Sequence, residues 1–340
     1  MLDNSKKSLP SLIDLRNSIP DEYFRPNVIK SLYFFGFDIF IISLLYISVY
    51  LFDSVYYLPI FWFATGTMFW SLFVVGHDCG HGSFSKSKFL NSLIGHLCHT
   101  PLLVPYHGWR ISHQMHHRNT GNIDKDETWY PLTENQFNNL TSLQKIARYK
   151  LFLIVFPLYL FVRSPGKDGS HFLPSSPLFN NSERNRVLVS TSMWALMVLF
   201  LLTLIYMFGL YFIFIYYFIP FTIFVIWLSL VTYLHHTDVS IPWYRGEDWS
   251  FTKGALSTID RSYGIFDPIH HNIGTHVIHH IFAGIPHYNL IGAKNYIKNI
   301  LGDSYREDYS PILSKFLESS SNCDVVNDIG SPVYYKKANK

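Results

Sequence analysis

The sequence predicts an all-α, multi-pass integral membrane protein with four transmembrane helices and a cytoplasmic cap rich in histidine. Charged residues make up only 15% of the 340 residues and aromatic residues 18%, and the mean hydropathy is positive. Four apolar runs approach the roughly 20 residues that a helix needs to cross a bilayer. The net charge of +3 is spread thinly, with no basic arm interleaved with aromatic residues, which argues against a nucleic-acid partner.

The chain is expected to begin with a polar arm that leads into a transmembrane hairpin. Residues 1–32 are expected to be a cytoplasmic arm on the membrane surface, because the first apolar run begins too late for a signal peptide. The runs 33–52 and 56–76 together predict the first hairpin, residues 33–76. Asp38 is the one charged residue in the first run, so we expect it near the headgroups or facing the bundle interior.

A central region, residues 77–186, follows the first hairpin and is expected on the cytoplasmic side. Its apolar segments 93–104 and 149–162 are too short to cross a bilayer, so both are expected to lie at the membrane interface. Three histidines in or near the first segment are expected to be polar residues at the membrane face rather than metal ligands: His96, His99 and His107.

A second transmembrane hairpin is predicted for residues 187–234. Its two apolar runs are separated by little more than Gly209, and Pro220 is expected to kink the second helix. Residues 235–340 are polar overall and predict a second cytoplasmic region.

The distribution of basic residues supports this topology. Lys and Arg number 5 in residues 1–32, 12 in residues 77–186 and 10 in residues 237–340, whereas the two short turns carry none. The positive-inside rule therefore places the arm, the central region and the carboxy-terminal region on the cytoplasmic side. Four spans then bring every histidine stretch to one face of the membrane.

Three short stretches hold eight of the seventeen histidines. They are His77-Asp-Cys-Gly-His81, His113-Gln-Met-His116-His117 and His276-Val-Ile-His279-His280. On a helix, residues three or four apart lie on one face, so each stretch can direct its imidazoles toward one point. Neutral imidazole binds iron, zinc, copper or nickel, and eight imidazoles exceed the needs of a single ion. The sequence therefore predicts two metal ions.

Other candidate polar residues lie near these stretches. Cys79 is expected to be a small residue between two ligands rather than a thiolate ligand, and the three cysteines form no C-x-x-C pair. The acidic stretch with Asp124, Asp126 and Glu127 fits two interpretations equally. It either accepts the outer N–H groups of ligating imidazoles or forms a solvated loop.

The three stretches resemble the histidine boxes of the membrane fatty acid desaturases in order, spacing and position at the ends of spans. The resemblance extends to Pro105-Tyr-His-Gly-Trp-Arg-Ile-Ser-His113, to Asp260-Arg261 and to the segment from Gly274 to Tyr288. The segments 77–84 and 169–172 look most like the omega-3 (delta-15) branch of cyanobacteria and plastids. The delta-12 branch is similar but tends to have a bulkier residue where Gly82 stands.

The resemblance implies a di-iron centre that uses O2 to insert a cis double bond near the methyl end of an unsaturated acyl chain held in a membrane glycerolipid. The implied metal ligands are the eight box histidines, His77, His81, His113, His116, His117, His276, His279 and His280, and a ninth, His236. His236 is preferred to the adjacent His235 as the ninth ligand, and His270 and His271 are expected to support ligands or lie at the surface. A delta-12 desaturase and a membrane di-iron hydroxylase remain alternatives.

The two electrons must come from an external donor, ferredoxin or another. The chain has no flavin or nicotinamide fingerprint and no His-Pro-Gly-Gly haem signature, and the plastid-type resemblance implies ferredoxin as donor. An acidic carrier is expected to dock on basic residues of the cytoplasmic face, namely Arg110, Arg118, Lys145, Arg148 and Lys150. The expected location is the thylakoid or plasma membrane of a cyanobacterium-like cell. A membrane metal carrier is disfavoured, because the spans contain almost no ionisable residues.

Overall fold

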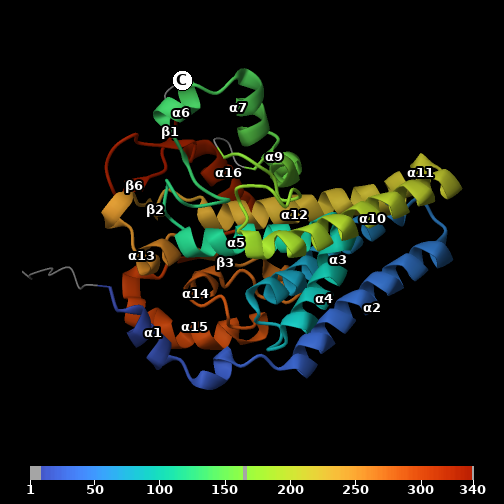
Figure 1. Ribbon diagram of the computed structural model, residues 1–340, viewed down its shortest axis with the longest axis horizontal. Coiled ribbons are helices and arrows are strands. Elements are labelled where there is room, and N and C mark those ends of the chain that lie inside the picture. Colours follow the sequence, from blue (N-terminus) through green and yellow to red (C-terminus); the bar gives the residue numbers. More distant parts are fainter. Residues whose placement is uncertain (1–8, 164–166, 339–340) are drawn as a thin grey trace, which may run out of the picture.

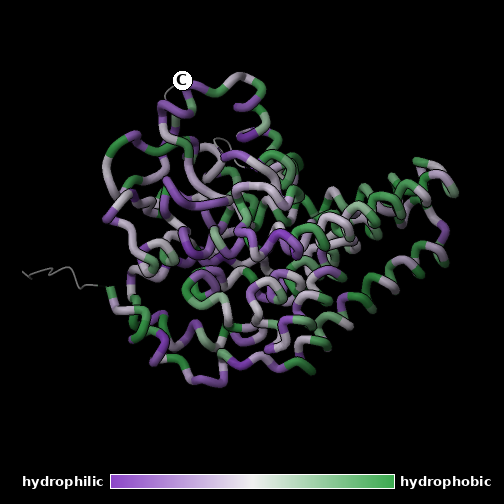
Figure 2. The backbone as a smooth tube through the Cα atoms, viewed as in Figure 1, coloured by the Kyte–Doolittle hydropathy of each residue, from purple (hydrophilic) through white to green (hydrophobic). Residues whose placement is uncertain are grey.

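Four long apolar helices form the bundle that extends to the right in Figure 1. They are α2 (Val28–Phe52), α3 (Leu58–His81), α10 (Arg184–Phe208) and the continuous helical segment that ends in α12 (Ile219–His236). The structure is a computed structural model that describes residues 9–163 and 167–338. All four helical segments are long and apolar enough to cross a membrane, and Figure 2 shows apolar residues along them.

α3 is the central helix of this bundle. Two thirds of its apolar stretch is buried (67%), against 11% for α2 and for α10, which present apolar side chains outward. α3 and α12 cross closely at Gly66, because a Cβ atom there would lie 2.6 Å from the carbonyl oxygen of Pro220. α3 ends at Gly82, whose positive φ of 75° is the usual conformation of a glycine that terminates a helix.

The helix that contains Pro220 is disturbed, as the sequence predicts. α11 (Leu210–Ile213) is followed by a π-helical turn (Phe214–Phe218), and Pro220 lies in the first turn of α12. Proline lacks an amide N–H and crowds the preceding turn, so a widened π turn accommodates it. Gly209 separates α10 from α11 with a positive φ of 86°.

A polar cap lies at the left-hand end of the bundle in Figure 1. α5 (Tyr106–Asn119) and α14 (His276–Ile281) lie at its centre, and α15 (His287–Leu301) and α1 (Leu12–Ser18) pack below them. Valine, isoleucine and leucine side chains of α14 and α15 form a separate apolar core with Leu15 of α1. The remaining helices of the cap are α4 (Lys88–His99), α6 (Glu134–Asn138), α7 (Ser142–Tyr149), α8 (Phe152–Val155), α9 (Tyr159–Val162), α13 (Phe251–Ala255) and α16 (Ile312–Asn322).

The cap also contains three pairs of two-residue strands, so the protein is mostly helical rather than all-α. β1 (Leu132–Thr133) pairs in parallel with β5 (Val325–Val326), and β3 (Asp260–Arg261) with β4 (Glu307–Asp308). β2 (Pro242–Trp243) pairs antiparallel with β6 (Val333–Tyr334). Each pair joins the carboxy-terminal segment to an earlier loop. Hydropathy alone misses such pairs because two residues carry no periodic signal.

The two short apolar segments form short helices and helical turns. α4 exposes a stripe of apolar side chains spaced four residues apart, Phe89, Leu93 and Leu97. Residues 149–162 hold α8, a 3₁₀ turn and α9, with Leu151, Ile154, Leu158 and Phe161 exposed. Neither segment is long enough to span a bilayer.

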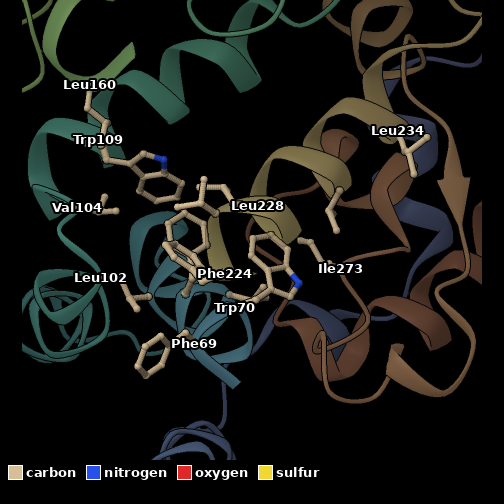
Figure 3. Close-up of a cluster of buried hydrophobic side chains, with 14 of the residues drawn as sticks. Phe69, Trp70, Leu102, Val104, Trp109, Leu160, Phe224, Leu228, Leu234 and Ile273 are labelled. Carbon is tan, nitrogen blue, oxygen red and sulfur yellow. The ribbon is translucent and has the colours of Figure 1, made fainter. Parts of the chain in front are cut away.

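A cluster of buried aromatic and aliphatic side chains joins the bundle to the cap. Figure 3 shows Phe69 and Trp70 of α3, Phe224 and Leu228 of α12 and Trp109 of α5 meeting in this cluster. The indole of Trp109 stacks on the ring of His113, with centroids 4.6 Å apart and planes 16° apart. The cluster therefore gives the histidines of α3 and α5 a rigid apolar base.

Candidate metal centre

Four helices bring the predicted ligands together. α3 and α12 deliver His77, His81 and His236 from their last turns, and the cap helices α5 and α14 carry the other ligands. The other six come from those two helices: His113, His116, His117, His276, His279 and His280. All nine histidines meet where the bundle joins the cap.

The histidines form two adjoining groups. In the first, the candidate ligand atoms of five histidines all lie within 4.8 Å of one another: His77, His81, His113, His117 and His279. In the second, the same holds for His116, His236 and His280. His276 adjoins the second group, because its Nε2 lies 3.0 Å from the Nε2 atoms of both His236 and His280.

The second and third histidine stretches are divided between the two groups. Neighbouring residues on a helix point about 100° apart. His116 therefore faces one group while His117 faces the other, and His280 and His279 divide in the same way. One H-x-x-H-H stretch thus serves two positions, which the spacing alone does not reveal.

The residues fit metal ions in chemistry and in geometry. Nε2 of His77 lies 3.2 Å from Nε2 of His81, and Nε2 of His113 lies 3.1 Å from Nε2 of His117. Such spacings suit two nitrogens bound to one cation at about 2.0–2.1 Å each. His279 leaves its buried Nε2 without a hydrogen-bond partner among the described residues. A cation would satisfy the lone pairs that converge here.

Burial favours the neutral form of several of these imidazoles. Burial and, to a smaller extent, the neighbouring histidines lower the pKa values of His113, His117 and His280 well below the ordinary value. Neutral imidazole is the form that binds a metal. With no carboxylate in either group, the set suits iron or copper better than magnesium or calcium.

Hydrogen bonds behind the groups orient several rings. The Nδ1 atom of His116 lies 2.7 Å from a carboxylate oxygen of Asp126, and the Nδ1 atom of His280 lies 3.0 Å from the hydroxyl of Thr120. Such partners fix the tautomer of a ligating histidine and leave Nε2 free for the metal. The role of Thr120 was missed at the sequence level, because it lies outside the three stretches.

The residues of the acidic stretch near residue 126 have different environments. Asp126 is fully buried and accepts from His116, which resolves its alternatives in favour of ring orientation. Glu127 is also buried, but its carboxylate pairs with the guanidinium of Arg163 at 2.8 Å. Asp124 is exposed, as a solvated loop predicts.

Asp78 and His287 connect the first histidine stretch to the beginning of α15. Asp78 Oδ2 accepts from the backbone N–H of His287 at 3.0 Å and lies 2.9 Å from its Nδ1. The other carboxylate oxygen lies 3.6 Å from Nδ1 of His77. Sequence reasoning did not predict this contact, because 209 residues separate the two partners.

The two adjacent histidines at the end of α12 have different environments. His235 uses both ring nitrogens elsewhere: Nδ1 contacts the carbonyl oxygen of Ile259 at 2.6 Å, and Nε2 contacts the hydroxyl of Tyr263 at 3.1 Å. His236 directs Nε2 toward His276. The geometry thus favours His236 over His235 as a ligand.

His270 and His271 lie outside both groups and are buried, so the surface position, one of the two alternatives expected for them, is wrong. His271 contacts Asp38 at 2.8 Å and Ser71 at 2.9 Å, which also places Asp38 in the bundle interior. His270 packs against the indole of Trp227, with ring centroids 4.5 Å apart. Aromatic side chains of the bundle cover both histidines, which local sequence does not show.

The remaining candidates also lie outside the two groups. His96, His99 and His107 belong to neither group, in keeping with the expectation that they are not ligands, and all three are buried. They contact Ser190, the carbonyl oxygen of Phe73 and Ser92, respectively. Cys79 is buried in an apolar cluster of α3 and α4, in agreement with its interpretation as a small spacer.

Comparisons with known proteins define the family. A family model described as fatty acid desaturase matches residues 54–310. The chain is 57% identical over 330 residues to an sn-1 acyl-lipid omega-3 desaturase (ferredoxin) of Nostoc, covering 97% of this chain and 92% of the relative. A Synechocystis protein of the same description is 56% identical over 326 residues, covering 96% and 91%. The chain therefore belongs to the fatty acid desaturase family.

A plant relative extends the comparison. A temperature-sensitive sn-2 acyl-lipid omega-3 desaturase (ferredoxin), chloroplastic, of Arabidopsis thaliana is 45% identical over 336 residues. The match covers 96% of this chain and 77% of the relative. Similarity thus extends from the bundle through the whole cap.

Proposed function

We propose that this protein is an O2-dependent acyl-lipid omega-3 (delta-15) desaturase. It inserts a cis double bond near the methyl end of an unsaturated acyl chain in a membrane lipid. The observation that carries this proposal is the pair of adjoining, buried imidazole groups at the end of an apolar bundle. The cyanobacterial and plastid relatives described as omega-3 desaturases support the same position for the new double bond.

The metal is proposed to be a pair of iron ions. His77, His81, His113, His117 and His279 would hold one ion, and His116, His236, His276 and His280 would hold the other. When bound, the iron pair would activate dioxygen for removal of hydrogen from an unactivated C–H bond. Overall, the acyl chain loses two hydrogens, and O2 takes up these, two electrons and two protons to give two waters.

The protein's own side chains prepare this site. Seven of the nine histidines are buried, which excludes bulk water from them. Asp126 and Thr120 hold the rings of His116 and His280. Trp109 supports His113 from below by stacking.

A cavity of about 350 Å³ beside the second histidine group is the proposed place for the acyl chain. Its lining is mainly apolar and aromatic, with Phe152, Val155, Leu158 and Tyr233 among its residues. Trp129 lines the cavity and packs near His236, with ring centroids 6.4 Å apart. An acyl chain in this cavity would therefore pass close to the second group.

The membrane arrangement is proposed to be four spans with the histidines on the cytoplasmic side. α3 and α12 both end at the cap, and the turns near residues 53–57 and at Gly209 lie at the opposite end of the bundle. These turns contain no Lys or Arg, in keeping with the positive-inside rule. The proposed location is the thylakoid or plasma membrane. Ferredoxin, named in the descriptions of cyanobacterial relatives, is the proposed donor.

The test is the fatty acid profile of a host that expresses the chain with a ferredoxin supply and is fed linoleate or oleate. Alpha-linolenate from linoleate is the expected product. Linoleate from oleate would move the enzyme to the delta-12 branch, and hydroxylated lipids would favour a di-iron hydroxylase. The His117→Ala variant is the negative control, because it removes a proposed ligand. The proposal would be refuted if the wild-type protein binds iron in the host and both fatty acids remain unchanged.

A further inference from the structure

The metal-binding region approaches the surface at one edge. Among the nine clustered histidines, only His81 and His113 are partly exposed. Gln114 lies beside them and is also partly exposed, and its side-chain amide donates to the carbonyl oxygen of Gly80 at 2.9 Å. An electron from outside the protein has the shortest route to the histidine groups at this edge.

The edge is bordered by positive charge. Residues 79–119 contain four basic residues, Lys86, Lys88, Arg110 and Arg118, and no Asp or Glu. None of the four forms an ion pair within the part of the chain that the structure describes. Their charges are therefore available to a partner.

α5 places two of these arginines beside the histidines. Arg110, Gln114 and Arg118 are spaced four residues apart and form one stripe, next to the stripe of His113 and His117. Arg110 donates to the side-chain oxygen of Gln114 at 3.2 Å, so the stripe is connected. On its other side, Ile111 and Met115 of α5 pack against Val187 of α10.

The first turn of α10 extends the basic surface. Arg184 and Arg186 are exposed there, with Glu183 as the only acidic neighbour in that turn. Burial is the largest cause of the lowered pKa of Arg110. The nearby charge of Arg186 lowers this pKa further, whereas the charge of Glu183 raises it. We call Arg110, Arg118, Arg184 and Arg186 the arginine patch.

The position of Arg118 favours a protein partner over lipid headgroups. The amino end of α5 meets α10, where the backbone N–H of His107 donates to Ser190 at 2.8 Å. From there α5 leads into the cap (Figure 1). Arg118 follows Arg110 by eight residues, which is about 12 Å along a helix. The patch therefore extends from the bundle into the cap.

The basic residues of α7 do not share this position. Arg148 donates to the carbonyl oxygen of Tyr130 at 2.9 Å and lines the cavity, and the ammonium of Lys145 lies 4.3 Å from the ring centre of Phe137. Lys150 directly follows α7 as its C-cap residue. Of the five cations expected to dock a carrier, only Arg110 and Arg118 lie on the helix that carries His113 and His117.

We propose that the arginine patch is the docking surface for an acidic one-electron carrier protein of the ferredoxin class. This inference rests on the proposed desaturase function. Complementary charge would orient the carrier over the exposed edges of His81 and His113 and raise the rate of productive encounter. Each turnover would need two such encounters, because the carrier delivers one electron at a time.

The test compares two electron sources with the same purified, iron-loaded enzyme in neutral phosphatidylcholine vesicles. Reduced ferredoxin is the first source, and dithionite, a small molecule that needs no docking surface, is the second. Arg118→Glu and Arg186→Glu should each lower kcat/KM for ferredoxin at least fivefold at low ionic strength. The ratio of ferredoxin-driven to dithionite-driven turnover should fall with it. The difference in kcat/KM for ferredoxin between each variant and wild type should shrink in high salt, because salt screens surface charges.

Lys145→Glu is the matched control, and it should leave the kcat/KM for ferredoxin unchanged. Arg186→Glu guards against a local effect of Arg118→Glu on neighbouring His117, and iron content is measured in every variant. An unchanged kcat/KM for ferredoxin in both arginine variants would overturn the docking surface. An equal loss with both electron sources would also overturn it and would indicate a role in the site or at the lipid. If the wild-type enzyme is inactive with both ferredoxin and dithionite, the proposed function itself is refuted.

Discussion

His116 and Asp126 are joined by a buried contact of 2.7 Å between the imidazole Nδ1 and a carboxylate oxygen. The same oxygen accepts from the backbone N–H groups of Thr128 and Trp129, at 3.1 and 3.2 Å. Backbone groups of its own loop therefore hold the carboxylate in place, in addition to its contact with the ring. It fixes the His116 tautomer that directs Nε2 into the second histidine group.

We expect Asp126→Asn to weaken metal binding at that group. The amide has the size of the carboxylate but not its charge, so ring orientation and ligand basicity both suffer, and 10–100-fold losses in affinity or activity are typical. The measurement is iron retained per protein after dialysis against a chelator, together with turnover. Asp124→Asn, an exposed change in the same loop, is the control. Equal iron retention in both variants would show that Asp126 does not support a ligand.

His236→Ala and His235→Ala should have different effects, although the residues are adjacent. Loss of His236 removes an imidazole from the second group, so we expect turnover to fall to background and one iron to bind weakly. Loss of His235 removes contacts with Ile259 and Tyr263, so we expect lower thermal stability, with iron content largely retained. Iron analysis and thermal unfolding of both variants check this. The assignment fails if His235→Ala is the variant that loses iron.

The sequence indicated the helical bundle and the histidines because both leave local signals. Apolar runs of about 20 residues and histidines at helical spacing are visible without knowledge of distant contacts. The preference for His236 over the adjacent His235 came from the resemblance to the desaturase family, since both histidines stand at the end of the same span. Helix geometry points His116 and His117 in different directions. Their division between two groups also requires that histidines of other helices lie on both sides of α5, which the sequence does not show.

The parts that sequence reasoning missed depend on long-range contacts. The contact of Asp78 with His287 spans 209 residues, and that of Asp38 with His271 spans 233. Neither pair has a fixed spacing or a periodic pattern, so no window of sequence contains the signal. The same reason explains why the buried positions of His96, His99 and His107 were not expected.

Gly66 should be needed for the crossing of α3 and α12. A Cβ atom there would lie 2.5 Å from Cβ of Ile223 and 2.6 Å from the carbonyl oxygen of Pro220, so the two helices must separate. We expect Gly66→Ala to destabilise the protein by about 1–3 kcal/mol, the usual cost of overpacking. Gly36→Ala in α2 is the control, because nothing lies within 4 Å of its added Cβ. Thermal unfolding in detergent should show a lower Tm for Gly66→Ala alone; similar Tm values for both would contradict the close crossing.

Glu307 should contribute stability that is lost in acid. Burial raises the pKa of this carboxyl group, but hydrogen bonds from Lys298, Lys294 and Tyr309 outweigh burial and lower it to about 2. An unfolded glutamate has a pKa of about 4.3, so the folded state gains stability above that pH and loses it as the pH falls toward 2. Thermal unfolding between pH 3 and 7 should therefore show Glu307→Gln less stable than wild type at pH 7, with a narrowing gap below about pH 4. Glu22→Gln, at an exposed position, should behave as wild type. A gap that does not depend on pH would refute the ionic contribution.

Filling the cavity beside the second histidine group should block the acyl chain without removing metal. Ala147 lines this cavity from α7, whereas Leu143, one turn earlier on the same helix, points outward and is 75% exposed. We expect Ala147→Trp to lower the rate of double-bond formation tenfold or more, because the indole occupies apolar volume that the chain needs. Leu143→Trp adds the same group outside the cavity and should leave the rate near that of wild type. The rate is measured with linoleoyl lipid in vesicles, and iron content is measured alongside to separate loss of substrate from loss of metal. If Ala147→Trp retains the wild-type rate with full iron, the acyl chain must reach the histidines by another route.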